Sequence, residues 1–232
     1  MLDFARFDAM TFDCYGTLVD WEAGLLTALR PFASRITPPV PSDQLLLECY
    51  ARHEAALERG PFIAYKLVMR GCLAGMASEL GFRVLPGEDD TLSRSIKDWP
   101  AFDDTAEAMR RLKSKYRLCV CSNIDRDLFE GSRSKVGAAL DALVTAEDVE
   151  SYKPARAHLE RAPEMLGVPR ERIVHVAQSL YHDIVPAREM GYATVWVNRQ
   201  QGRWGATPAV AEGARADMEV QSMAALADAA GV

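Results

Sequence analysis

The sequence lacks the features of a secreted or membrane-bound protein. Its five cysteines are an odd number without the spacing of a disulfide framework, which is typical of a reducing cytoplasm. No run approaches the roughly 20 uninterrupted apolar residues that a membrane-spanning helix needs. The first residues carry charges and lead directly into an apolar strand, so no signal peptide is visible. We therefore expect a cytoplasmic protein without a membrane partner.

An excess of positive charge is missing as well. Lys and Arg number 27 against 33 Asp and Glu, which gives a net charge of −6, and no dense Lys/Arg run occurs. This composition argues against a nucleic-acid partner. The four histidines are scattered without the spacing of metal ligands. Cys119 and Cys121 fall on the same side of a predicted strand, and we interpret them as packing residues, not as a redox or metal pair.

Short apolar runs alternate with helical patterns through much of the chain of 232 residues. Runs rich in β-branched and aromatic residues predict five buried strands. They cover residues 7–12, 118–121, 142–145, 173–177 and 193–197. Such alternation is typical of an α/β fold with a doubly wound, Rossmann-like parallel sheet.

Residues 21–99 break this rhythm because they contain no convincing strand. Helical patterns separated by proline-rich segments predict four helices there. They cover residues 22–30, 43–58, 62–80 and 89–97. We predict a core domain of residues 1–19 and 99–232, and an inserted helical cap domain of residues 20–98 that closes over the carboxyl edge of the sheet. The Ala-rich tail after about Gly202 is expected to end in a surface helix.

Asp13 follows the first apolar run, at the sheet edge where ligands bind in such folds. A carboxylate there can attack an electrophilic carbon and form an ester, with the Thr17 hydroxyl orienting it, or it can simply cap the turn. Tyr15 stands where a second carboxylate would help to hold a divalent metal. This pattern favours a nucleophile acting on carbon over phosphoryl transfer.

Three further polar segments follow predicted strands. Ser122 and Asn123 can bind a carboxylate or the nucleophile, although turns also favour these residue types. Lys153 would lower the pKa of Asp13 and keep it ionised if the two are adjacent; an isolated Lys-Pro is also typical of a solvated loop. Asp183 can activate a water molecule or serve as a helix N-cap. The order and placement of the four segments together favour catalysis.

These segments resemble the four motifs of the haloacid dehalogenase superfamily, over nearly the whole chain. The motifs are Asp-x-Tyr-Gly-Thr-Leu from Asp13, the strand ending in Ser122 and Asn123, the Lys-Pro loop at Lys153, and the late Asp183. The inserted helices correspond to that superfamily's cap domain. Residues 12–18 and 195–199 are similar to the type II L-2-haloacid dehalogenases.

The resemblance implies a reaction and roles for these residues. Asp13 would displace halide from C2 of a small 2-haloalkanoic acid, and water would hydrolyse the aspartyl ester to a 2-hydroxy acid. Lys153 would stabilise Asp13, and Asp183 would help to activate the water. The nucleophile and the substrate carboxylate would be oriented by Thr17, Ser122 and Asn123. No cofactor is expected, and the family's frequent dimers leave a homodimer open.

The chain departs from both branches of the superfamily. The phosphatase branch has acids where this chain has Tyr15 and Gln178, so we expect metal-free chemistry with these two residues contacting substrate. Mg²⁺ is expected only if the chain is a phosphatase. Dehalogenase caps supply an arginine for halide or carboxylate, and Arg52 is the best candidate, followed by Arg59 and Arg70.

Three alternatives to halide displacement stay open. The first is another leaving group alpha to a carboxylate, such as a strained ring nitrogen. The second is a Mg²⁺-dependent phosphatase of small esters. The third is a degenerate family member that only binds a ligand or partner, which the presence of Asp13, Lys153 and Asp183 argues against.

Overall fold

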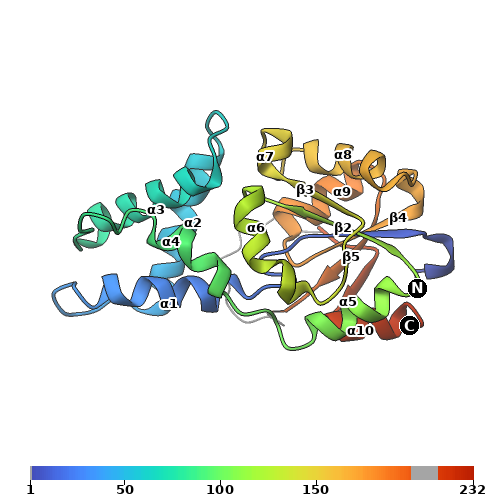
Figure 1. The fold of residues 1–232 in the computed structure, drawn as a ribbon, viewed down its shortest axis with the longest axis horizontal. Coiled ribbons are helices and arrows are strands. Elements are labelled where there is room, and N and C mark those ends of the chain that lie inside the picture. Colours follow the sequence, from blue (N-terminus) through green and yellow to red (C-terminus); the bar gives the residue numbers. More distant parts are fainter. Residues whose placement is uncertain (1, 200–213) are drawn as a thin grey trace.

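A parallel six-stranded sheet forms the body of the protein. The computed structural model describes residues 2–199 and 214–232. The strand order is β3-β2-β1-β4-β5-β6, with every neighbouring pair parallel (Figure 1). The strands are β1 (Ala9–Phe12), β2 (Arg117–Ser122), β3 (Ala142–Thr145), β4 (Ile173–Ala177), β5 (Ala193–Val197) and β6 (Met218–Val220). This confirms the predicted fold class and all five predicted strands.

Helices cover both faces of this sheet. Figure 1 shows α8 and α9 on one face and α5 and α10 on the other. The helices outside the insertion are α5 (Thr105–Lys113), α6 (Arg126–Arg133), α7 (Ala146–Val149), α8 (Ala157–Leu166), α9 (Val185–Glu189) and α10 (Met223–Ala229). Short 3-10 turns are η1 (Phe4–Arg6), η3 (Ser134–Val136) and η4 (Arg170–Arg172), and η5 (Leu180–Ile184) is a π-helical turn. The predicted final helix is α10; residues 200–213 of the predicted tail lie outside the described residues.

Two-sided burial explains why the strands read as continuous apolar runs. Successive side chains of a strand point to opposite faces. In β1, Met10 and Phe12 belong to the larger core, which includes residues of α5 and α10, whereas Ala9 packs with the α8 side. Cys119 and Cys121 also lie in the α8 core, fully buried and without a disulfide. They are packing residues, as predicted.

The inserted segment forms four helices beside the sheet (Figure 1). They are α1 (Trp21–Ala33), α2 (Asp43–Glu58), α3 (Tyr65–Leu80) and α4 (Thr91–Ser95), followed by the short turn η2 (Ile96–Asp98). We call these four the cap helices. The bounds of α2 agree with the prediction, and Ser42 caps it by accepting a hydrogen bond from the Leu45 amide at 3.2 Å. The division into domains at residues 20–98 stays a prediction.

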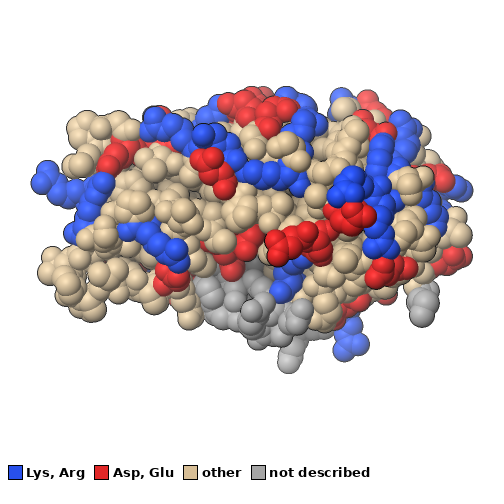
Figure 2. Space-filling model, turned by 60° about the horizontal axis from the view of Figure 1, so that its bottom comes forward, with Lys and Arg blue, Asp and Glu red and all other residues tan. Residues whose placement is uncertain are grey.

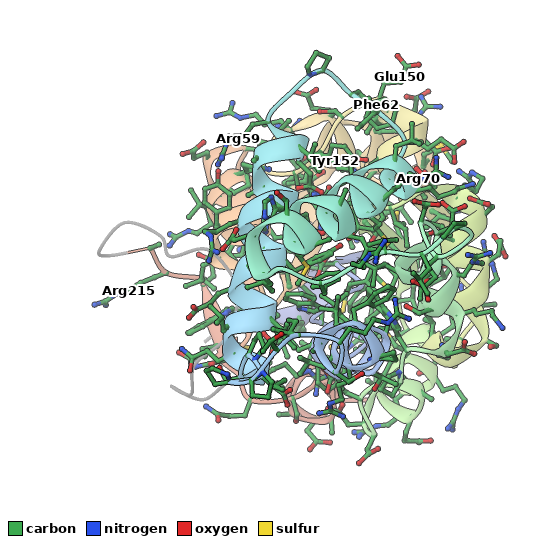
Figure 3. All side chains as sticks on the ribbon, turned by 90° about the vertical axis from the view of Figure 1, so that its left-hand side faces the viewer. Arg59, Phe62, Arg70, Glu150, Tyr152 and Arg215 are labelled. Atoms are coloured by element: carbon green, nitrogen blue, oxygen red, sulfur yellow. The ribbon has the colours of Figure 1, made fainter. Side chains whose placement is uncertain are left out.

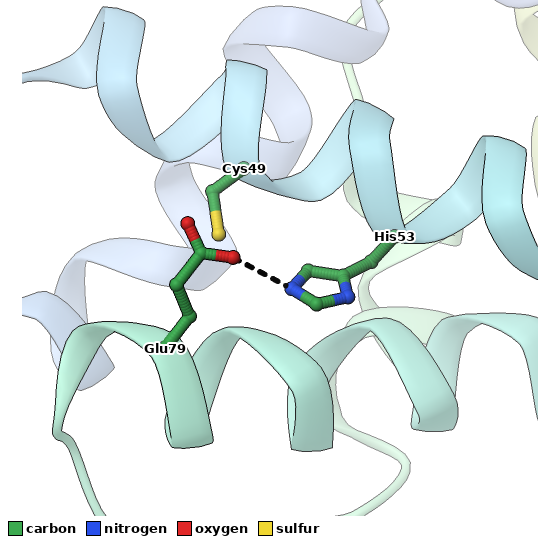
Figure 4. A group of neighbouring side chains, drawn as sticks. All are labelled: Cys49, His53 and Glu79. Atoms are coloured by element: carbon green, nitrogen blue, oxygen red, sulfur yellow. Dashed lines mark hydrogen bonds and ion pairs between the residues drawn. The ribbon is translucent and has the colours of Figure 1, made fainter.

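A polar contact joins α2 to α3 (Figure 4). His53 Nε2 lies 3.1 Å from Glu79 Oε2, next to the buried Cys49 thiol. Gly75 permits this approach, since a Cβ there would lie 2.5 Å from His53 Nδ1. Among the described residues, these three ligand-type side chains are the group close enough together to share an ion. They stand apart from the residues that line the cavity described below.

A core residue holds the cap helices over the sheet edge. Helix α3 has no side-chain cap of its own. Instead, Asp125, from the loop after β2, accepts hydrogen bonds from the amides of Tyr65 at 2.7 Å and Lys66 at 3.0 Å. Tyr152 reinforces this joint by donating its hydroxyl to the Ile63 carbonyl at 2.8 Å. A carboxylate at a helix N-terminus is stabilised by the free amides and the helix dipole.

Basic and acidic side chains are interspersed over the face that Figure 2 shows. Many form exposed ion pairs, such as Arg126 with Asp148 at 2.6 Å.

Within residues 2–199 and 214–232, no helix is both long and apolar enough to span a bilayer.

Candidate active site

A cavity lies between the carboxyl ends of the central strands and the cap helices. Residues that follow β1, β2 and β4 form one side, and α2 with its neighbours forms the other. The core side consists of Asp13, Tyr15, Ser122, Asn123, Lys153, Gln178, Ser179, His182 and Asp183. The cap side consists of Trp21, Ala51, Glu54, Ala55, Glu58, Tyr65 and Trp99. Seven of the nine predicted catalytic and substrate-binding residues therefore line one cavity. An eighth, Thr17, is hydrogen-bonded to Asp13 beside it.

Lys153 joins two carboxylates at the centre of this cavity. Its ammonium donates to Asp13 Oδ1 at 2.8 Å, to Asp183 Oδ1 at 2.7 Å and to the Cys121 carbonyl at 3.0 Å. These three bonds use every donor of the ammonium. Burial lowers the pKa of Lys153, but the two carboxylate charges outweigh burial and raise that pKa above its usual value. Lys153 is only 3% exposed, so the solvated-loop interpretation is wrong.

Asp13 is fixed by the turn that follows β1. Thr17 Oγ1 donates to Asp13 Oδ2 at 2.8 Å and accepts from the Gln178 amide at 2.9 Å. Gly16 allows the turn with φ of +101°, a conformation that side chains disfavour. Burial raises the pKa of Asp13, the Lys153 charge lowers it and the Asp183 charge raises it again, with a net rise. Lys153 therefore lowers the pKa of Asp13, as predicted, but burial outweighs this effect.

Asp183 is hydrogen-bonded by His175, a residue of β4 that the sequence interpretation missed. His175 Nε2 lies 3.1 Å from Asp183 Oδ1, and His175 Nδ1 lies 2.8 Å from Thr11 Oγ1. The sequence signal that could have indicated His175 is a histidine inside the otherwise apolar strand β4. Burial raises the pKa of Asp183, but Lys153 and His175 outweigh burial and place it far below the usual range. Asp183 lies within the η5 turn, so the N-cap interpretation is wrong.

Asp183 and Ser122, which line the cavity, each have a side-chain oxygen without a protein partner. Asp183 Oδ2 and Ser122 Oγ are buried and have no hydrogen-bond partner among the described residues. Buried polar groups are almost always satisfied. Asn123 serves the lysine instead, because its Oδ1 accepts from the Lys153 amide at 2.7 Å and its Nδ2 donates to the Lys153 carbonyl at 3.2 Å. Two polar groups thus stay available to a ligand or water.

Tyr15 and Gln178 form part of the cavity wall, and their contact with substrate stays a prediction. The Tyr15 ring packs edge-to-face on Trp99, with centroids 5.6 Å apart, and its hydroxyl lies 3.1 Å from Ser132 Oγ. The Gln178 carbonyl accepts from Trp196 Nε1 at 2.8 Å. At the second position after Asp13 the cavity wall therefore has an aromatic ring and no acid.

Arg52 is not part of the cavity, so this predicted substrate contact is wrong. Its guanidinium pairs with Glu79 on α3 at 2.5 Å and is half exposed. Arg59 follows the end of α2, and Arg70, on α3, pairs with Asp90 at 2.7 Å (Figure 3). None of the three lines the cavity. Arg52 lies away from the cavity because a different side of α2 faces it.

That side of α2 carries two acidic residues that the sequence interpretation also missed. Ala51, Glu54, Ala55 and Glu58 line the cavity at the spacing of one helical face. Glu54 accepts hydrogen bonds from the hydroxyls of Tyr65 at 2.6 Å and Tyr50 at 3.1 Å. Burial raises the pKa of Glu54 and raises that of Glu58 well above its usual value. The sequence signal that could have indicated these residues is the spacing of Glu54 and Glu58, four residues apart on one helix.

Comparison with known proteins places this fold and site in one family. A family model described as haloacid dehalogenase-like hydrolase matches residues 7–191. The chain belongs to this family. Among the relatives of this haloacid dehalogenase-like hydrolase is an (S)-2-haloacid dehalogenase of Pseudomonas fluorescens, 27% identical over 210 residues that cover 82% of this chain and 84% of that protein. A second relative, from Pseudomonas putida, is also named (S)-2-haloacid dehalogenase. It is 28% identical over 146 residues, which cover 62% of this chain and 64% of that protein.

Solved structures share the fold of this haloacid dehalogenase-like hydrolase. An L-2-haloacid dehalogenase of Xanthobacter autotrophicus, with chloropropionic acid covalently bound, matches it with a TM-score of 0.78. The match covers 96% of this chain and 97% of the other at 17% identity. At that identity the likeness establishes the fold, with the helical insertion included in the matched length.

The site of this haloacid dehalogenase-like hydrolase does not fit Mg²⁺. This ion needs near-octahedral coordination by oxygen atoms at about 2.0–2.1 Å. The core side offers two carboxylates, Asp13 and Asp183, and the Lys153 ammonium already lies between them at 2.8 and 2.7 Å. Tyr15, two residues after Asp13, adds an aromatic side chain to the lining and no carboxylate. The arrangement therefore places a fixed lysine charge, not an ion, between the carboxylates.

Proposed function

We propose that this protein is a hydrolase in which Asp13 displaces halide from C2 of a small 2-haloalkanoic acid through an aspartyl ester. The observation that carries the proposal is the buried Asp13–Lys153–Asp183 arrangement beside Tyr15, in which the lysine bonds both carboxylates of the core side. The names of the Pseudomonas relatives and the covalently bound chloropropionic acid of the Xanthobacter structure support it. No cofactor enters the reaction.

In the first step, one Asp13 oxygen forms a bond to C2 while the carbon–halogen bond breaks and halide leaves with its electron pair. Thr17 and Lys153 hold the carboxylate in place through bonds of 2.8 Å each. An oriented nucleophile lowers the entropic part of the barrier. We place the substrate carboxylate at the unpartnered Ser122 hydroxyl.

In the second step, water attacks the carboxyl carbon of the Asp13 ester. Asp183 Oδ2 has no protein partner and can accept a hydrogen bond from this water. The Lys153 ammonium stabilises the negative charge that develops on the Asp13 oxygen. The acyl–oxygen bond then breaks, one proton of the water ends on the product hydroxyl, the other is released to solvent, and Asp13 regains its carboxylate. The product keeps an oxygen that belonged to Asp13.

Oxygen labelling tests this route directly. Multiple turnovers of 2-chloropropionate in ¹⁸O water are expected to place the label in the Asp13 carboxylate, because each ester hydrolysis exchanges one of its oxygens. The label is located by mass spectrometry of the peptide that contains Asp13. Halide release is expected to be unchanged by a chelator. A single turnover that labels the product and leaves Asp13 unlabelled would exclude the ester.

We expect activity to fall at acid pH, because only ionised Asp13 can attack carbon. Burial raises the pKa of Asp13, so its carboxylate forms at a pH above the usual value of about 3.9. kcat/KM should therefore rise with pH through this raised pKa. This rise is the acid limb of the pH profile. The double variant Glu54→Gln/Glu58→Gln should keep the acid limb, since only the cap carboxyls are removed. A limb that disappears in the double variant would contradict the assignment to Asp13.

A second candidate keeps the Asp13 chemistry and changes the leaving group to a strained ring nitrogen alpha to a carboxylate. The observation that favours it is Glu58, a carboxyl in the cavity whose pKa is raised well above its usual value by burial. A protonated carboxyl can donate a proton to a nitrogen leaving group, which halide does not require. Comparing halide release with ring opening of small heterocyclic acids separates the two.

A further inference from the structure

The cavity has an unusual charge balance for a site that takes a simple anion. Its lining includes four carboxyl groups, from Asp13, Asp183, Glu54 and Glu58. Lys153 is the one Lys or Arg side chain among the lining residues that the structure describes. Its three donors are all used within the protein. Burial lowers the pKa of His182, the remaining basic group of the lining, to about 4, so His182 is neutral at pH 7.

The two cap carboxyls are held in place by the protein. Glu54 accepts from the hydroxyls of Tyr65 and Tyr50, which themselves lie 3.2 Å apart. Glu58 lies one helical turn further along the same face of α2 and lines the cavity together with Asn123, the residue that fixes the backbone of Lys153. The two tyrosine bonds orient Glu54, and the shared helix face directs Glu58 to the same cavity. A freely solvated helix face would show no such partners.

Aromatic rings complete the cap side of the cavity. Trp21, Tyr65 and Trp99 line it together with Glu54 and Glu58. Carboxylates together with aromatic rings are the groups that bind a cationic nitrogen, through charge-assisted hydrogen bonds and cation–π contacts. Burial raises the pKa of Glu54 and of Glu58, and a cationic nitrogen beside them opposes that rise because it favours their ionised form. A halide or carboxylate placed beside two carboxyls would gain nothing from either. The cap side is therefore suited to a positive group.

An independent observation shows that the opposite side is prepared for a ligand. Ser122 and Asp183 line the cavity, and their Oγ and Oδ2 atoms are buried and have no hydrogen-bond partner in the described protein. The hydroxyl can donate to an anionic group, and the carboxylate oxygen can accept from a water molecule. The cavity thus has a donor on its core side and acceptors on its cap side.

We infer that the substrate is a small zwitterion, a carboxylic acid with an ammonium group next to the carbon that Asp13 attacks. Glu54 and Glu58 bind the ammonium, and Ser122 binds the carboxylate. This inference rests on the proposed function, because the reacting carbon is defined by Asp13. It makes the two cap carboxyls the residues that determine which 2-substituted acid is accepted.

Binding of unreactive ligands tests this inference without any chemistry. β-Alanine and propionate have similar size and a carboxylate, but only β-alanine has an ammonium. We expect the intact wild-type protein to bind β-alanine at least tenfold more tightly than propionate in calorimetric titrations at pH 7, the size of effect that one charged hydrogen bond gives. Equal or weaker binding of β-alanine would overturn the inference.

Variants of α2 locate the ammonium site. Glu54→Gln and Glu58→Gln should each lower the preference for β-alanine about tenfold by weakening β-alanine and not propionate. Glu48→Gln removes an acid from the same helix, away from the cavity, and should leave the preference unchanged. A wild-type preference that survives both cavity substitutions would show that the ammonium binds elsewhere and would overturn the assignment.

Turnover experiments separate this inference from the proposed function. If Asp13 is labelled from ¹⁸O water with 2-chloropropionate while β-alanine shows no preference, the nucleophile stands and the ammonium site is wrong. If 3-amino-2-chloropropionate is consumed with kcat/KM at least tenfold above 2-chloropropionate, and Glu58→Gln reduces that ratio, both stand. If β-alanine is preferred but Asp13 is never labelled with either acid, the site binds zwitterions and the proposed reaction is wrong.

Discussion

Replacing Asp13 by Asn is expected to lower kcat for halide release by about 10³-fold or more. The amide keeps the shape of the side chain but has no ionised oxygen to attack C2, so the covalent route closes. The bond from Thr17 Oγ1 at 2.8 Å can be kept by the amide oxygen. Lys153 retains Asp183 as its partner at 2.7 Å, so the variant should fold. Halide release and near-UV circular dichroism measure the two expectations.

Asp103→Asn is the matched control for this experiment. Asp103 is exposed in the segment that connects the cap helices to α5, and it does not line the cavity. Its substitution should leave kcat and KM unchanged within a factor of two, as surface substitutions have small effects. If Asp13→Asn keeps more than a tenth of the wild-type kcat with a native spectrum, Asp13 is not the nucleophile.

The core side of the site could be predicted because strand ends are simple to recognise. Each of the apolar runs before Asp13 and Ser122 ends at the same edge of a parallel sheet, so their placement follows from the fold class alone. The sequence could not show that Lys153 Nζ would lie 2.8 and 2.7 Å from two carboxylates. Nor could it show that burial would outweigh that charge at Asp13, because burial depends on the whole fold.

The cap side could not be predicted because its helices pack on one another as well as on the core. The side of α2 with Glu54 and Glu58 has the polar pattern of a solvent-facing surface, and only tertiary contacts reveal that it faces the cavity. The charge of Arg52 makes it a candidate for binding an anion, yet its place on the helix directs it to Glu79 on α3. Strand β6 was missed because three residues are too short to show a period.

Replacing Lys153 by Met should damage both stability and activity. The substitution leaves Asp13 and Asp183 buried next to each other without the ammonium that bonds both. Removing one partner of a buried ion pair typically costs about 3–5 kcal/mol, which we expect as a loss in the free energy of unfolding measured in urea. Lys66→Met is the control, because its pair with Asp127 is exposed and should contribute less than about 1 kcal/mol.

A second substitution distinguishes the structural part of this effect from the chemical part. In Lys153→Met/Asp183→Asn, one of the two buried charges is gone, so most of the lost stability should return. Activity should stay at least about 10²-fold below wild type, because Asp13 still lacks the ammonium that stabilises charge on its oxygens and the attacking water has lost the Asp183 carboxylate as its acceptor. The like charge of Asp183 raises the pKa of Asp13 and the charge of Lys153 lowers it. The acid limb of any residual activity should therefore lie at higher pH in Lys153→Met than in the double variant. A double variant that regains wild-type kcat would show that Lys153 acts only by balancing Asp183.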